Sequence, residues 1–198
     1  MTTTTTHHSL RLPELCDYER QFQAIKADVA ALVAGLDEDA FNWRPAPNRW
    51  SIAECIVHLN ATGELILPPL LQKVERAREQ GRIASGAFRR TLFSRVFLAF
   101  MEPPYKVKIP GPRPLLPEQQ CHRLEVADEL IALQDRIIAA MAAADGLDLG
   151  GMKMNSPFRR PVRITLAEWF LFLAAHERRH LWQAANVRRE GRFSGAHS

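Results

Sequence analysis

Near its C-terminus the chain reads His176-Glu177-Arg178-Arg179-His180, with two histidines four residues apart. On an α-helix such residues lie one above the other on the same face, because one turn takes about 3.6 residues. Both imidazoles can therefore reach a single metal ion, at about 2.0–2.1 Å from each nitrogen. Apolar side chains share the histidine face, namely Trp169, Leu173, Ala184 and Val187. The stretch predicts two metal ligands on the inward face of a helix, and a metal site there needs a third.

The best candidate for the third ligand is His58, which lies far upstream in residues 50–59. This segment reads Trp-Ser-Ile-Ala-Glu-Cys-Ile-Val-His-Leu. Ser51 and Glu54 form a capping box, since their side chains can accept hydrogen bonds from free N–H groups at the start of a helix. His58 then lies two turns into that helix. Three histidines from two helices would leave coordination positions open for water or substrate, which is typical of a catalytic site.

The two motifs together resemble those of the DinB-like superfamily of small metal-binding four-helix bundles. The resemblance rests on the Trp-Ser-x-x-Glu-x-x-x-His-Leu run of residues 50–59 and on the His-x-x-x-His-x-x-Gln run of residues 176–183, and it covers roughly residues 15–189. It implies that His58, His176 and His180 are the metal ligands.

Members of that superfamily include metal-dependent transferases and isomerases that use low-molecular-weight thiols, proteins proposed to be hydrolases, and many without a known reaction. By this resemblance we expect a small-molecule substrate, including a low-molecular-weight thiol, and a homodimer. The expected cofactor is a divalent transition metal, zinc first and nickel as the alternative. Such an ion lowers the pKa of a bound water or thiol, so hydrolysis and thiol transfer both remain open.

The composition fits one small domain. At 198 residues, of which 46% are hydrophobic, the chain can bury one core, and we expect flexible tails at residues 1–11 and 191–198 around a domain of residues 12–190. No apolar run is long enough to span a membrane, and the threonine-rich start lacks the pattern of a signal peptide. We therefore expect a cytoplasmic protein. The cysteines show no C-x-x-C spacing and are expected to be reduced: Cys16, Cys55 and Cys121.

The expected fold is all-α, a four-helix bundle. Apolar residues at three-and-four spacing predict helices over residues 12–36 and 116–144. The first capping box predicts a helix over residues 51–78, in which Pro68 and Pro69 should cause a kink or an interruption. A second capping box, Thr165 with Glu168, opens the fourth helix, which carries the histidine pair.

An insert lies between the second and third bundle helices. A helix-like aromatic stripe in residues 84–101 is followed by a proline-rich run to residue 117, and residues 73–113 hold ten Lys or Arg against three Glu. A basic aromatic insert could bind nucleic acid or an anionic membrane surface. We favour a short extra helix that covers the bundle and expect no nucleic-acid partner, because no nucleic-acid motif is present. Basic side chains there would suit an anionic substrate, in particular Arg89, Arg90 and Arg113.

Two alternatives from other classes stay open. The His-Glu-x-x-His string of residues 176–180 is also that of zinc metalloproteases, in which Glu177 would activate the attacking water. Because few ligands follow it, we interpret Glu177 instead as a solvated or salt-bridged helix residue. The other alternative is a metal-binding or interaction bundle without activity. Candidate pocket residues are Trp50, Thr62 and Gln183, whereas Glu54 is assigned to capping rather than to orienting a ligand histidine.

Overall fold

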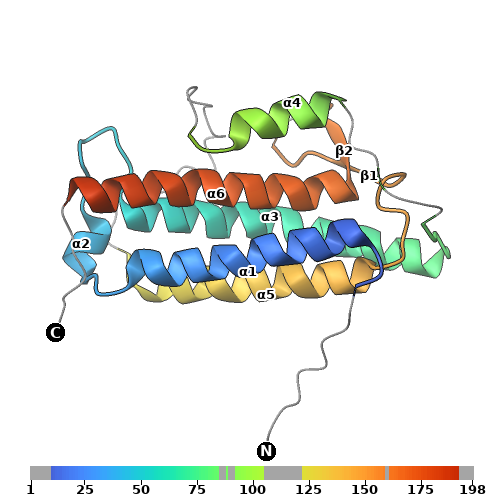
Figure 1. Cartoon of the computed structure of the whole chain (residues 1–198), viewed down its shortest axis with the longest axis horizontal. Coiled ribbons are helices and arrows are strands. Elements are labelled where there is room, and N and C mark those ends of the chain that lie inside the picture. Colours follow the sequence, from blue (N-terminus) through green and yellow to red (C-terminus); the bar gives the residue numbers. More distant parts are fainter. Residues whose placement is uncertain (1–9, 85–87, 89–91, 105–121, 159–160, 192–198) are drawn as a thin grey trace, which may run out of the picture.

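Four long helices packed side by side form the body of the protein in the computed structural model (Figure 1). The structure describes residues 10–84, 88, 92–104, 122–158 and 161–191. The bundle helices are α1 (Pro13–Val33), α3 (Ile52–Glu79), α5 (Glu125–Ala144) and α6 (Leu166–Glu190). The predicted all-α four-helix fold is therefore confirmed.

The pairing of the helices decides which side chains meet in the core. α1 packs against α5 and α6, and α3 packs against the same two helices, so α5 and α6 face one another diagonally across the bundle. α3 and α6 run in opposite directions, since the start of α3 lies near Glu190 through its ion pair with Arg49. Their inward faces supply the histidines of the two motifs.

Both predicted capping boxes are present. The Ser51 hydroxyl accepts a hydrogen bond from the Glu54 backbone N–H, and Thr165 and Glu168 make the equivalent pair at the start of α6. Pro68 and Pro69 do not interrupt α3, which continues to Glu79. Pro68 is exposed and Pro69 half-buried, so carbonyl groups left without a helical donor lie towards solvent. The predicted kink stays a prediction.

Several smaller elements join the bundle helices. The third bundle helix begins at Glu125, so the expectation of helix from residue 116 is wrong for residues 122–124, and residues 116–121 lie outside the described part. A short helix, α2 (Glu38–Asn42), capped by the Asp37 side chain, was not predicted. Neither was the small antiparallel pair β1 (Lys153–Asn155) and β2 (Arg163–Thr165), because three-residue strands are too short to show a period.

The insert contributes one described helix, α4 (Leu92–Met101), which lies along the outside of α6 (Figure 1). Leu98 and Met101 are buried on the bundle side, whereas Val96 and Phe100 are exposed. The predicted extra helix is thus present over Leu92–Met101, and most of residues 84–91 lie outside the described part. Arg89, Arg90 and Arg113 lie outside the described residues. No helix in the part of the chain that the structure describes is long and apolar enough to cross a membrane.

Gly63 of α3 lies tightly against Leu133 of α5, which gives a first prediction. A Cβ atom built at Gly63 would lie 2.3 Å from Leu133 Cδ2, a side chain that is itself buried. We expect Gly63→Ala to lower the free energy of unfolding by about 1–3 kcal/mol, despite the better helix propensity of alanine, because the core is overpacked. Urea unfolding followed by circular dichroism measures this.

The steric explanation has its own control. In the double variant Gly63→Ala/Leu133→Ala the added methyl group enters space that the leucine vacated. We expect its free energy of unfolding to exceed the value that adding the two single losses would give. Strict additivity of the two losses would show that the helices do not compete for this space.

Candidate metal centre

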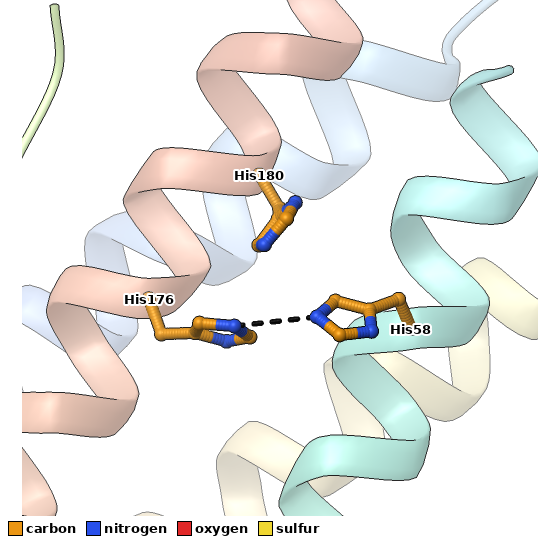
Figure 2. Close-up of side chains that lie close together, drawn as sticks. All are labelled: His58, His176 and His180. Carbon is orange, nitrogen blue, oxygen red and sulfur yellow. Dashed lines mark hydrogen bonds between the residues drawn. The ribbon is translucent and has the colours of Figure 1, made fainter. Parts of the chain in front are cut away.

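Three histidine side chains from α3 and α6 converge inside the bundle (Figure 2). His176 and His180 project from consecutive turns of α6, and His58 reaches them from the facing turn of α3. One ligand atom from each residue can be chosen so that all three lie within 4.8 Å of one another. The structure thereby brings together the three residues that the two motifs predicted.

The spacing of these nitrogens suits a metal ion. The Nε2 atoms of His58 and His176 are 3.3 Å apart. Two nitrogens bound to one tetrahedral ion at about 2.0–2.1 Å are themselves about 3.4 Å apart. The first pair therefore has the required separation, and a ring nitrogen of His180 lies within 4.8 Å of both. A divalent ion fits this donor set.

Burial keeps the α6 imidazoles in the neutral form that a metal requires. Desolvation, followed by repulsion from His180, His58 and Arg179, lowers the pKa of His176 well below its ordinary value. The pKa of His180 falls to about 3, first because of burial and then because of His58 and Arg179, while a hydrogen bond with Gln183 opposes the shift. Both imidazoles keep a free lone pair at neutral pH.

Aromatic rings flank two of the ligands. Trp50, just before the start of α3, stacks on His180 with ring centroids 5.5 Å apart and an angle of 24° between the planes. Phe172, one turn before His176 on α6, stacks on that imidazole at 5.4 Å and 18°. Trp50 was predicted to be a pocket residue, but Phe172 was missed. Its position four residues before a ligand on the same helix could have revealed it.

The family assignment follows from a comparison with known protein families, in which the DinB superfamily model matches residues 21–184. The chain belongs to the DinB superfamily. The matched span includes all three histidines and reaches from α1 into α6. No curated protein and no solved structure matches the chain.

In this DinB superfamily member, Glu54 caps the N-terminus of α3 rather than orienting a metal ligand. One of its carboxylate oxygens accepts a hydrogen bond of 2.8 Å from the Ser51 backbone N–H, and both oxygens receive hydrogen bonds from the Arg44 guanidinium. These contacts hold the carboxylate at the N-terminus of α3. The preference for a capping role over orientation of a ligand histidine is thus confirmed.

Glu177 differs from its expected environment. It is only 1% exposed, and it forms no ion pair with any residue that the structure describes, so the interpretation as a solvated or salt-bridged residue is wrong. Burial raises its pKa to about 8, against the opposing influence of nearby Gln134 and Arg178. Neither carboxylate oxygen has a hydrogen-bond partner among the described residues. Gln134 belongs to α5, the helix diagonally opposite. A position about 100° around α6 from His176 lies within the core rather than in solvent.

Gln183, Thr62 and Cys55 are the remaining candidate residues near the histidine cluster. Gln183 is half-buried and makes a hydrogen bond to His180, and its place in a substrate pocket stays a prediction. Thr62 lies one turn after His58 and is buried, with no hydrogen-bond partner for Oγ1 among the described residues. Burial, and next the charge of Glu54, raise the pKa of the Cys55 thiol, so it stays protonated and is a poor metal ligand. Cys16 and Cys55 are free, and Cys121 lies outside the described residues.

Proposed function

We propose that this protein is a metal-dependent enzyme that acts on a small molecule as a thiol transferase or a hydrolase. His58, His176 and His180 would hold one divalent ion, zinc first and nickel as the alternative. The observation that carries the proposal is the convergence of three imidazoles, one buried and two half-buried, of which two have depressed pKa values. Membership of the DinB superfamily supports it.

The number of histidine ligands indicates which kind of metal site this is. Three protein ligands leave at least one position open on a zinc ion, which is the usual arrangement in catalytic rather than structural sites. When bound, the ion supplies Lewis acidity, which lowers the pKa of a coordinated water or thiol. Trp50 and Phe172 each cover one face of a ligand imidazole, that of His180 and that of His176. A low-molecular-weight thiol and a small electrophile are the substrates we propose to test first.

Metal content and thiol transfer test this proposal together. Protein purified without an affinity tag that contains histidine should bind about one zinc or nickel ion per chain, measured by elemental analysis after dialysis. Loaded protein should then accelerate the reaction of a fluorogenic electrophile with glutathione or cysteine, and a chelator should remove that acceleration. Absence of bound metal at micromolar free zinc would contradict the site itself.

A zinc metalloprotease is the less favoured alternative. It would need the Glu177 carboxylate to act as general base on water at the metal. That side chain is buried, its pKa is raised, and it is not among the residues that converge at the metal centre. If wild-type protein cleaved a peptide and Glu177→Gln lowered that rate about a hundredfold, the protease assignment would replace ours.

A bundle that binds metal or a partner without catalysis is the other alternative. Metal binding without turnover across thiol and hydrolase substrates would favour it. A homodimer is part of our proposal in both cases, and analytical ultracentrifugation of metal-free and metal-loaded protein tests it.

A further inference from the structure

We propose that Phe172 is a positioning residue for the ligand His176, and that helix α4 controls this position through Phe97. The inference rests on the proposed role of His176 as a metal ligand. It assigns the insert between the second and third bundle helices a role in the geometry of the site.

Three rings connect the insert to the metal centre. Phe97 of α4 stacks on Phe172 with ring centroids 6.2 Å apart and an angle of 7° between the planes. Phe172 in turn stacks on the His176 imidazole at 5.4 Å and 18°. These separations lie in the range of about 4.5–7 Å in which aromatic rings attract one another. The planes of the three rings are therefore close to parallel from the insert to the ligand.

Contacts at its edge also hold Phe172 in place. Trp169 meets its ring edge-on, with centroids 5.5 Å apart, and Phe158 packs against it at 5.9 Å. Phe172 is thus enclosed by rings from α4, from α6 itself and from the segment between β1 and β2. A displacement of α4 would remove one side of this enclosure.

The stacked rings matter for the orientation of His176 because its Nδ1 atom lacks the hydrogen bond that usually fixes a ligand histidine. A metal-binding histidine generally donates its second N–H group to a carboxylate, a carbonyl or a water, which fixes the plane of the ring. The Nδ1 atom of His176 is buried and has no hydrogen-bond partner among the described residues. The rings of His58 and His180 meet this imidazole at an angle, with centroids 5.1 and 4.7 Å away, whereas Phe172 lies flat against one of its faces. We infer that this flat contact takes the place of the missing hydrogen bond in fixing the plane of the ring.

The C-terminal end of α4 is attached to α6 between the two ligands of that helix. Arg178 donates two hydrogen bonds to the Glu102 carboxylate, one of them 2.9 Å long. The buried Arg179 donates to the Phe100 carbonyl at 3.2 Å. Because both arginines lie between His176 and His180, α4 is held against the turn of α6 that presents the ligands.

The first experiment uses metal-free protein, so that it decides the inference whether or not the site binds metal. Stacked rings shift one another's proton resonances, and NMR of ¹⁵N- and ¹³C-labelled protein at pH 7.5 can follow the ring protons of His176. We expect Phe172→Leu and Phe97→Leu each to move these resonances, and Phe172→Tyr to leave them near the wild-type positions.

A matched control and a double variant test whether Phe97 acts on His176 through Phe172. Phe100→Leu makes the same change on α4 at a side chain that is 59% exposed, and it should leave the His176 resonances unchanged. In the Phe172→Leu background, Phe97→Leu should add no further shift. Equal shifts from Phe97→Leu and Phe100→Leu, or an undiminished effect of Phe97→Leu without Phe172, would overturn the inference.

The second experiment measures the metal site itself. We expect Phe172→Leu to weaken zinc binding by ~10-fold or more and to alter the visible spectrum of the Co²⁺-loaded protein, whereas Phe172→Tyr should retain both properties. Wild-type affinity and spectrum in Phe172→Leu would show that the stack has only a packing role. If wild-type protein bound no metal, the proposed function would fail while the NMR result still decided the positioning.

Discussion

In a His176→Ala variant, the affinity for zinc is expected to fall by more than ~100-fold. Removing a residue that only orients a metal ligand already lowers metal affinity by about 10–100-fold, and this substitution removes the ligand itself. His58 and His180 would remain as a pair on two helices, with two of four tetrahedral positions unfilled by protein. Competition with a chromophoric chelator at constant pH measures the change. His58→Ala should give the same result, because both nitrogens of the 3.3 Å pair are needed.

His122→Ala is the matched control for loss of a histidine. His122 is half-buried and its backbone pairs with the Asn42 side chain, outside the cluster of three. We expect zinc affinity to remain within about twofold of wild type. Circular dichroism should show unchanged helix content in all three alanine variants, since alanine is the best helix former. A loss of zinc affinity in His122→Ala equal to that in His176→Ala would mean that the metal is not bound where we propose.

Replacing Glu177 by glutamine is expected to stabilise the metal-free protein at alkaline pH. The folded-state pKa of Glu177 is raised from the ordinary 4.5 to about 8, so the folded protein binds this proton more tightly than the unfolded chain. The contribution of the carboxyl to stability is complete below pH 4.5 and decreases as the pH rises to about 8. At about 1.4 kcal/mol for each pKa unit, the decrease is on the order of 5 kcal/mol. Glutamine cannot ionise, so the Glu177→Gln variant does not undergo this loss of stability at alkaline pH.

The measurement compares the two proteins in chelator at pH 4.5 and at pH 9. Their difference in free energy of unfolding should be small at the acidic pH and should grow to several kcal/mol in favour of Glu177→Gln at the alkaline one. Other titrating groups are common to both proteins and cancel in the difference. Glu129→Gln, at an exposed position of α5, is the control and should show a difference within about 0.5 kcal/mol at both values. If the difference in free energy of unfolding between wild type and Glu177→Gln were the same at both pH values, water would have to reach the carboxylate.

The histidine pair of α6 and the starts of both ligand helices could be predicted because they depend on local geometry. Four-residue spacing places His176 and His180 on one helical face whatever surrounds the helix. The capping residues Ser51 and Thr165 begin α3 and α6 where the patterns predicted, since each capping box satisfies N–H groups of its own first turn. The encounter of His58 with the α6 pair is a tertiary contact, and it was inferred from the resemblance of two motifs to one family.

The supports of the site could not be predicted in the same way. Periodicity places Glu177 about 100° from His176, but it does not say whether solvent or α5 occupies that side. The answer came from the diagonal packing of α5 and α6, which buries Glu177 near Gln134. The stack from Phe97 to His176 likewise joins residues about eighty positions apart.

By itself, the sequence determined the helical faces, the two capping boxes and the shared face of His176 and His180. These properties follow from interactions within one or two turns, which a short segment carries wherever it is placed. Only the tertiary structure decided the burial of Glu177, the attachment of α4 through Arg178 and Arg179, and the ring that restrains His176. Each of these depends on which helix covers which face. That choice is made by the packing of the whole core, because a buried side chain takes its environment from residues remote in the chain.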